Sequence, residues 1–226
     1  MLEAHRLTVG AGPRKSFLPP ENDRAIVIYP GEASAPVPAV TEVQRIKTKV
    51  CLVGEAAVGK TSLVRRFVHD EFDDRYITTL GAKVSKREQE FVSRDRATSY
   101  HMDMTVWDIM GEKAFRDLLK DAYFHGAKGV LAVADLTRYS TLKELDDWVE
   151  NVFSVVGEIP VVYAINKMDL KDEATVLYGD REIAQSVRAF DAPYYYTSAK
   201  TGARVEDVFR RLGTLMLARA GMADLA

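Results

Sequence analysis

The order of apolar and polar positions separates a proline-rich start from a long region in which strand patterns and helix patterns alternate. Three continuous apolar runs are typical of strands buried on both faces: residues 47–54, 129–137 and 159–167. Four segments repeat apolar positions at helical spacing: residues 61–72, 141–156, 180–190 and 203–220. Residues 82–92 and 98–108 alternate around the polar turn SRDRA and predict a hairpin, and residues 192–200 predict a last strand.

This alternation predicts an α/β fold, in which a mainly parallel six-stranded sheet carries helices on both faces. In open sheets of this kind, ligands bind beyond the carboxyl ends of the strands. The polar motifs of this chain each follow a predicted strand. We therefore expect these motifs to meet at one end of the sheet and to form a single site.

The first 46 residues differ in composition from the rest of the chain. Six of the eight prolines fall here, and EASAPVPAV is typical of an extended linker. We expect a flexible, proline-rich extension over residues 1–46, one domain over residues 47–221, and a short tail over residues 222–226. A docking or targeting arm is the alternative interpretation of the extension, because AIVIYP at residues 25–30 has the composition of a short strand.

Composition excludes several classes of protein. The net charge of −2 offers no basic surplus for nucleic acid. The single cysteine, Cys51, excludes a disulfide framework within the chain and favours a reducing compartment. No apolar stretch reaches the roughly 18 residues of a membrane span, and the last residues hold no cysteine for a direct lipid anchor. We expect a cytoplasmic monomer that reaches a membrane surface only through a partner.

The motif GEAAVGKT follows the first buried strand and precedes a helix, which is the context of a phosphate-binding loop. Its backbone N–H groups are expected to wrap the phosphates, while Lys60 supplies a positive charge and the Thr61 hydroxyl binds Mg²⁺. The predicted phosphate-binding residues are Gly54, Glu55, Ala56, Ala57, Val58, Gly59, Lys60, Thr61 and Ser62. This motif indicates a nucleoside triphosphate but does not select the base.

Two tetrapeptides at later strand ends predict that the base is guanine. In NKMD (residues 166–169), the Asp169 carboxylate can accept hydrogen bonds from guanine N1–H and its exocyclic amine, two donors that adenine lacks. Asn166 is expected to tie this loop to the phosphate loop, and the Lys167 stem to pack on the base. In TSAK (residues 197–200), the Ala199 N–H is expected at guanine O6, with Ser198 and Lys200 beside it. An ATPase is the alternative that these two motifs argue against.

With these motifs in order, residues 47–220 resemble the Ras superfamily of small GTPases, and most closely its Rab branch. RRFVHDEFDDRYITTLGAKV (65–84) and WDIMGEKAFRDLLKDAYFHGAKGVLAVADLT (107–137) follow the Rab pattern around its two switch regions. The resemblance implies the P-loop NTPase fold of small G proteins. Without a cysteine near its end, the chain is similar to the tail-less members found in prokaryotes.

The resemblance also implies roles for residues outside these motifs. Thr79, with Thr78 as the less favoured alternative, would bind Mg²⁺ and the terminal phosphate, and Phe72 would lie against the guanine edge. Asp108 would hold Mg²⁺ through water, and the Gly111 N–H would bind the terminal phosphate. Metal binding would thus use Thr61, Thr79 and Asp108. GTP would order residues 72–82 and 108–118 for protein effectors and regulators, and its hydrolysis to GDP would release them.

The sequence departs from the family pattern at Glu112, where the family has a glutamine that orients the attacking water. An ionised carboxylate accepts hydrogen bonds but cannot donate them, and the terminal phosphate repels it. With Lys60 and Thr79 as the other catalytic residues, Glu112 could slow hydrolysis, act as a general base, or point to solvent. The alternative function is a nucleotide-bound interaction module that does not hydrolyse GTP. Arg75 is either a solvated loop arginine or an arginine acting on the phosphate in cis.

Overall fold

A computed structural model describes residues 42–75, 77–112, 121–172 and 178–222. Six strands form a single sheet: β1 (Glu42–Val53), β2 (Ala82–Val92), β3 (Thr98–Ile109), β4 (Gly129–Asp135), β5 (Val161–Asn166) and β6 (Tyr194–Tyr196). Their order is β2-β3-β1-β4-β5-β6, and only β2 runs antiparallel to its neighbour. The predicted six-stranded, mainly parallel sheet is confirmed.

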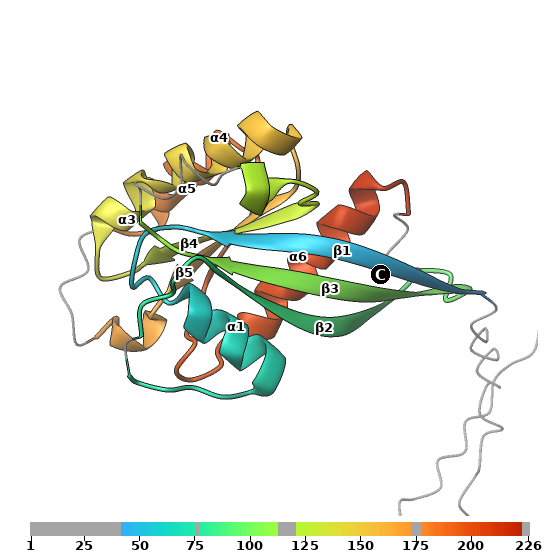
Figure 1. The fold of residues 1–226 in the computed structure, drawn as a ribbon, viewed down its shortest axis with the longest axis horizontal. Helices are drawn as coiled ribbons and strands as arrows, with labels where there is room; N and C mark the ends of the chain where they lie inside the picture. The colour runs from blue at the N-terminus through green and yellow to red at the C-terminus, as the bar shows by residue number, and fades with distance from the viewer. Residues whose placement is uncertain (1–41, 76, 113–120, 173–177, 223–226) are drawn as a thin grey trace, which may run out of the picture. The chain divides into compact units, whose positions relative to one another are not determined.

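Helices cover both faces of this sheet, as the apolar runs of its strands require (Figure 1). The helical elements are α1 (Lys60–His69), α3 (Tyr139–Lys143), α4 (Leu145–Val156), the 3₁₀ turn η1 (Met168–Leu170), α5 (Asp180–Arg188) and α6 (Val205–Arg219). Apolar residues of α1 and α6 pack on one face, where the Phe67 and Phe209 rings stack with centroids 3.8 Å apart. Residues of α3, α4 and α5 pack on the other face. Among the described helices, none has the length and apolar character needed to cross a bilayer.

The start of β1 and the helix predicted over residues 141–156 differ from the sequence predictions. Strand β1 begins at Glu42, so residues 42–46 pair with β3 although composition placed them in the extension. The polar and apolar residues of EVQRIK obscure this start, because this part of the strand is largely exposed. The predicted helix over 141–156 begins earlier, at Tyr139, and is divided at Glu144 into α3 and α4. Within α3, Thr141 is tied to the end of β4 by hydrogen bonds with Asp135. Residues 1–41 of the predicted extension and 223–226 of the predicted tail lie outside the described residues.

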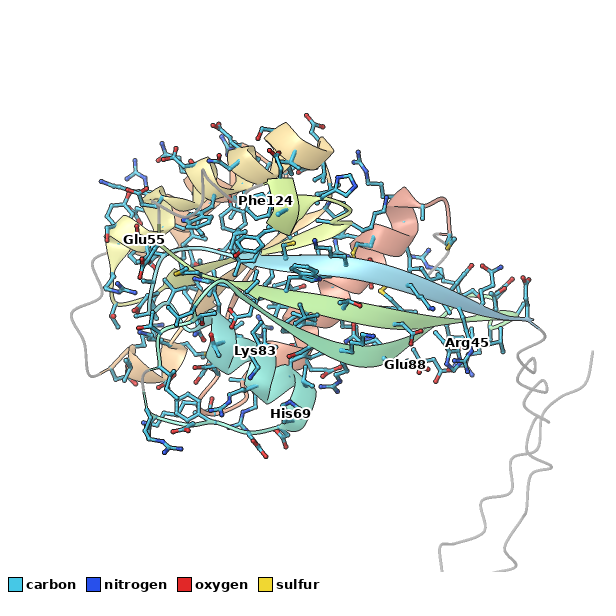
Figure 2. All side chains as sticks on the ribbon, in the orientation of Figure 1. Arg45, Glu55, His69, Lys83, Glu88 and Phe124 are labelled. Carbon is cyan, nitrogen blue, oxygen red and sulfur yellow. The ribbon has the colours of Figure 1, made fainter. Side chains whose placement is uncertain are left out.

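Charged side chains cover the end of the sheet that lies away from the predicted motifs. Figure 2 places Arg45 and Glu88 at the opposite end of the strands from Glu55, which belongs to the phosphate loop. In the middle of β2, Arg87 forms an ion pair of 2.9 Å with Glu206 of α6, and the His101 ring lies 2.6 Å from the neighbouring Glu88 carboxylate. The polar motifs are therefore concentrated at the other end of the sheet.

The single cysteine is buried in the centre of the sheet. Cys51 of β1 is 0% exposed, and burial raises the pKa of its thiol to about 12. We expect the native protein to react with iodoacetamide at pH 8 at least about a hundredfold more slowly than the unfolded chain, because the thiolate is the reactive species. Mass spectrometry of alkylated protein with and without guanidinium chloride measures this ratio. Rapid labelling of the folded chain would contradict the burial.

Candidate functional site

A cavity of about 740 Å³ opens at the carboxyl ends of β1, β3 and β5. This volume lies within the usual range for small-molecule sites, and both phosphate-loop and base-reading motifs contribute to its walls. The predicted residues that line the cavity are Ala56, Ala57, Gly59, Lys60, Thr61, Ser62, Phe72, Thr79, Gly111, Glu112, Asn166, Lys167, Asp169, Ala199 and Lys200. Segments more than a hundred residues apart in sequence therefore meet in one site.

The phosphate loop has a backbone that requires glycine at two positions. Gly54 has φ 133° and Gly59 has φ 100°, and both values lie in the region that side chains rarely adopt. A Cβ on Gly54 would lie 2.2 Å from the Val133 carbonyl oxygen, and one on Gly59 would lie 2.3 Å from Asn166 Nδ2. Ala57 adopts a left-handed φ of 62° without being glycine. The loop is therefore packed tightly against β4 and β5.

Lys60 begins α1 and is almost completely buried beneath the loop. Its ammonium donates to the carbonyl oxygens of Gly54 and Glu55, both at 2.7 Å. Burial lowers its pKa to about 8, although the Asp108 and Glu55 carboxylates act in the opposite direction. A cation held at the base of a polar loop is suited to bind a phosphate. The negative charge of the phosphate would stabilise the ammonium, which burial has removed from water.

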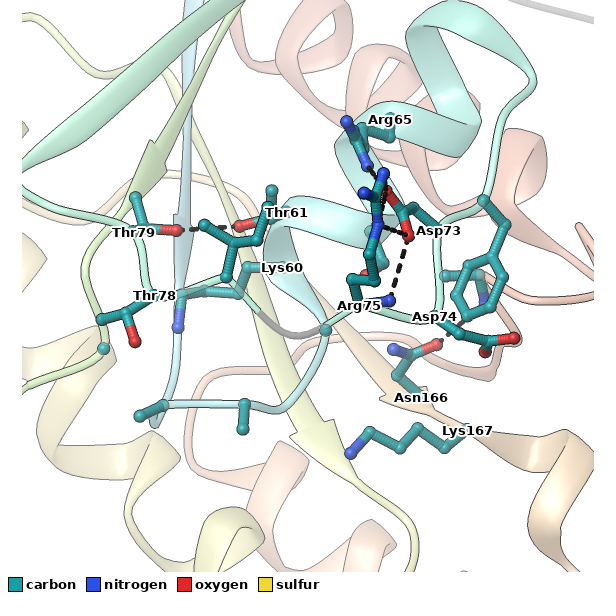
Figure 3. Close-up of a pocket in the computed structure, with 18 of the residues that line it drawn as sticks. Lys60, Thr61, Arg65, Asp73, Asp74, Arg75, Thr78, Thr79, Asn166 and Lys167 are labelled. Carbon is teal, nitrogen blue, oxygen red and sulfur yellow. Dashed lines mark hydrogen bonds and ion pairs between the residues drawn. The ribbon is translucent and has the colours of Figure 1, made fainter.

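Three oxygen-bearing side chains predicted to bind a metal meet beside Lys60. Thr61 Oγ1 donates to Asp108 Oδ2 at 2.5 Å. The same oxygen lies 3.0 Å from Thr79 Oγ1 (Figure 3). Because the single Thr61 proton is directed to Asp108, Thr79 is the donor in the second contact. Asp108 is 1% exposed, its Oδ1 accepts no hydrogen bond from the described residues, and burial raises its pKa. Hydroxyl and carboxylate oxygens of this kind fit Mg²⁺, which prefers oxygen ligands.

Asn166 connects the base-reading loops to the phosphate loop. Its Nδ2 donates to the Val58 carbonyl at 2.9 Å, while its Oδ1 accepts from Thr197 Oγ1 at 3.3 Å and from the Ala199 N–H at 3.2 Å. The tie to the phosphate loop agrees with the prediction. The Ala199 N–H, predicted to meet guanine O6, is engaged by Asn166 in this structure.

The Asp169 carboxylate lies at the wall of the cavity and is held from one side. Ser198 Oγ, which is buried, donates to Asp169 Oδ1 at 2.5 Å. This hydrogen bond orients the carboxylate and leaves its other oxygen available to a ligand. Phe72 and Lys200 line the same cavity, with Phe72 half-buried against the core and Lys200 exposed. The residues predicted to read the base are thus close together.

Gly111 and Glu112 follow β3 at the edge of the cavity. A Cβ on Gly111 would lie 2.5 Å from the Ala56 nitrogen, so the backbone at this position lies directly against the phosphate loop. Glu112 lines the cavity and is exposed to solvent. Residues 113–118 of the second predicted switch segment lie outside the described residues.

Two arginines that line the cavity are held in ion pairs with one aspartate. In Figure 3, Arg75 and Arg65 converge on Asp73, at 2.8 and 3.3 Å. The Arg75 side chain is 82% exposed and binds the two Asp73 oxygens through Nε and Nη2. In this arrangement Arg75 is engaged by Asp73 and largely solvated.

Sequence reasoning missed a buried acid and its cationic partners at the end of β4. Asp135 is 1% exposed, and its Oδ2 accepts from Lys167 Nζ at 2.7 Å and from Arg138 Nε at 2.9 Å. Arg138 Nη2 also donates to the Ala56 carbonyl at 2.9 Å. Asp135 is the first polar residue after the buried run GVLAVA, so its position at a strand end was the signal available in the sequence.

Comparison with known proteins gives a consistent result. A sequence model of the Ras family matches residues 49–218. The chain is similar to Ras-related protein Rab-21 of Bos taurus and of Homo sapiens, with 32% identity over 180 residues in each case. The matched region covers 79% of this chain and 77% and 76% of those relatives. The length of this similarity places the chain in the Ras family of small GTPases, near the Rab proteins, and it is therefore a guanine-nucleotide-binding enzyme that hydrolyses GTP.

Proposed function

We propose that this chain is a Mg²⁺-dependent molecular switch in which Thr61, Thr79 and Asp108 hold the metal and Lys60 binds the outer phosphates. The observation that carries the proposal is the contact between the Thr61 hydroxyl, the Thr79 hydroxyl and the buried Asp108 carboxylate. Thr79 comes from the loop between α1 and β2, so a ligand that draws these oxygens together would also order that loop.

Mg²⁺ fits this site because the available ligands are oxygens and none is a thiol or an imidazole. Within the part of the chain that the structure describes, no group of three or more His, Cys, Asp and Glu is arranged to hold a metal. A metal bound here would therefore also need oxygens of nucleotide phosphates and water as ligands. When bound, Mg²⁺ would neutralise charge on the phosphates during transfer to water.

The loop that carries Thr79 also supplies a surface for protein partners. Ile77 and Leu80 are 69% and 85% exposed, although apolar side chains of this size usually lie in the core. They flank the threonine that the terminal phosphate would draw in. We infer that effectors and regulators bind residues 72–82 and 108–118 when GTP holds these segments.

The chain's own residues account for the chemistry by positioning and charge. Lys60 would stabilise charge on the terminal phosphate, and the loop N–H groups would bind its oxygens, while the Thr79 backbone would hold the phosphate from the other side. Glu112 at the edge of the cavity would meet the attacking water. Its carboxylate can accept a proton from water but cannot donate to the transition state unless it is itself protonated.

The exposed position of Glu112 favours one alternative, a nucleotide-bound interaction module with negligible turnover. The two functions are separated by single-turnover GTP hydrolysis with Mg²⁺, comparing the natural chain with Glu112→Gln. We expect the glutamine variant to hydrolyse GTP about tenfold faster, because two like charges about 4 Å apart repel by roughly 1 kcal/mol in water and about 4 kcal/mol at an effective dielectric of about 20.

The control for this comparison is Glu71→Gln, which removes one negative charge from an exposed residue that does not line the cavity. Its rate should equal that of the natural chain. A natural rate equal to or above that of Glu112→Gln would mean that Glu112 is a working general base. Tight GTP binding with no hydrolysis in either protein would establish the interaction module.

A further inference from the structure

Arg138 bridges two parts of the site that belong to different loops. Its Nε donates to the buried carboxylate of Asp135, and its Nη2 donates to the backbone carbonyl of Ala56, both at 2.9 Å. The two contacts use separate nitrogens of one planar guanidinium, a geometry that fixes the direction of both. The segment after β4 therefore holds the outside of the phosphate loop.

The anchor for this bridge is a fixed negative charge. Burial alone would raise the pKa of Asp135, but hydrogen bonds from Lys167, Thr137 and Arg138 outweigh it, and the pKa lies below its ordinary value. Asp135 also accepts from Lys167 of the base-reading loop through the same Oδ2 that accepts from Arg138. The carboxylate thus joins the base-reading loop, the segment after β4 and, through Arg138, the phosphate loop.

The carbonyl that Arg138 holds belongs to a strained part of the backbone. It is the carbonyl of the peptide that links Ala56 to Ala57, and Ala57 has a left-handed φ of 62°. This conformation is unfavourable for a residue with a Cβ, so it persists only where neighbouring groups hold it. The backbone of Gly111 packs on the nitrogen of Ala56 from another direction. The hydrogen bond from Arg138 to the Ala56 carbonyl is one of the contacts that hold the loop in this shape.

The Arg138 charge also acts inside the site. The Lys60 pKa is lowered mainly by burial, and the Arg138 guanidinium contributes in the same direction. Arg138 is therefore close enough to Lys60 for its positive charge to be felt where phosphates would bind. The same field that disfavours a second cation favours an anionic ligand.

We propose that Arg138 is a positioning residue that keeps the phosphate loop in its nucleotide-binding shape before any phosphate arrives. It acts by holding the Ala56 carbonyl against the left-handed turn at Ala57, with the buried Asp135 carboxylate as its anchor. The expected effect of Arg138 on nucleotide binding rests on the proposed function. Its effect on the shape of the phosphate loop can be tested without nucleotide.

Hydrogen exchange in the nucleotide-free full chain tests the arrangement directly. We expect Arg138→Met to speed the exchange of backbone amides at residues 55–59 by about fivefold, the effect of losing one partly exposed charged hydrogen bond. Arg181→Met, which removes an exposed arginine on α5, is the matched control and should leave these amides unchanged. Unchanged exchange in Arg138→Met would overturn the proposal whether or not the chain binds nucleotide.

Dissociation of fluorescent GDP then separates positioning from general stability. We expect Arg138→Met to raise the dissociation rate about fivefold in the natural chain but less than twofold in an Ala57→Gly background, because glycine adopts the left-handed turn without strain. Equal increases in the two backgrounds would overturn the proposal.

Arg138→Lys is a second variant that keeps the charge. A lysine carries its donors on a single nitrogen and cannot reproduce the two directed contacts. We expect it to speed both exchange and dissociation. Rates equal to those of the natural chain would mean that charge alone suffices, and the bridging role would be wrong. A natural chain that fails to bind GDP would refute the proposed function, while the exchange experiment would still decide the role of Arg138.

Discussion

Asp169→Asn should weaken GDP binding by about three orders of magnitude while leaving the fold intact. Guanine presents two donors to this position, N1–H and the exocyclic amine, and sites built to hydrogen-bond such groups discriminate by roughly 10⁴–10⁵. The substitution replaces one carboxylate oxygen with an NH₂ group that would face a donor. Ser198 Oγ donates to Asp169 Oδ1, so in the variant the amide oxygen of residue 169 should accept this hydrogen bond. The NH₂ group of the amide would then face the cavity.

The same change should create a new preference. Xanthine carries a carbonyl oxygen where guanine has its amine, so an amide NH₂ at residue 169 can donate to it. We expect Asp169→Asn to bind xanthosine diphosphate more tightly than GDP in a competition with fluorescent GDP. Asp172→Asn, an exposed carboxylate outside the cavity, is the control and should bind GDP as the natural chain does. Unchanged GDP affinity in the Asp169 variant would mean that the base binds elsewhere.

Lys60→Met should have opposite effects on nucleotide binding and on the stability of the nucleotide-free protein. We expect GTP affinity to fall by at least about a hundredfold, because the variant lacks the only charge-assisted donor that lies under the phosphate loop in the described structure. The melting temperature without nucleotide should rise by a few degrees, since methionine fills the space without a buried charge. Calorimetric titration and thermal unfolding measure the two effects.

The pH dependence of this stability has a defined sign. The Lys60 pKa of about 8 lies below its ordinary value of 10.5, so between these values the unfolded chain binds more protons than the folded one. The nucleotide-free natural chain should therefore gain stability as pH rises from about 8 towards 10.5, and its deficit relative to Lys60→Met should shrink there. Lys128→Met, on an exposed residue outside the cavity, should not change this slope. A natural chain and Lys60→Met with parallel stability profiles would contradict the burial of the charge.

Local patterns along the chain were sufficient to predict the class of fold and to select most residues of the candidate site. Buried strands show as continuous apolar runs, and the phosphate loop, NKMD and TSAK each occupy consecutive residues with their own chemistry. Such motifs can be read without coordinates because their function depends on short-range spacing. The β2–β3 hairpin and strands β4 and β5 lie where the patterns predicted them, and helix α1 begins as predicted but ends at His69 rather than at residue 72.

Long-range contacts required the tertiary structure. The start of β1 at Glu42 depends on pairing with β3, which no local pattern reports. The bridge from Arg138 to Ala56 joins residues 82 positions apart, and Lys167 reaches Asp135 across 32 positions. Arg138 belongs to none of the nucleotide-binding motifs, so the sequence alone indicates only a solvated arginine there. Its role follows from the folded sheet, which brings the ends of β1, β4 and β5 together and places a buried carboxylate within reach of Arg138 and Lys167.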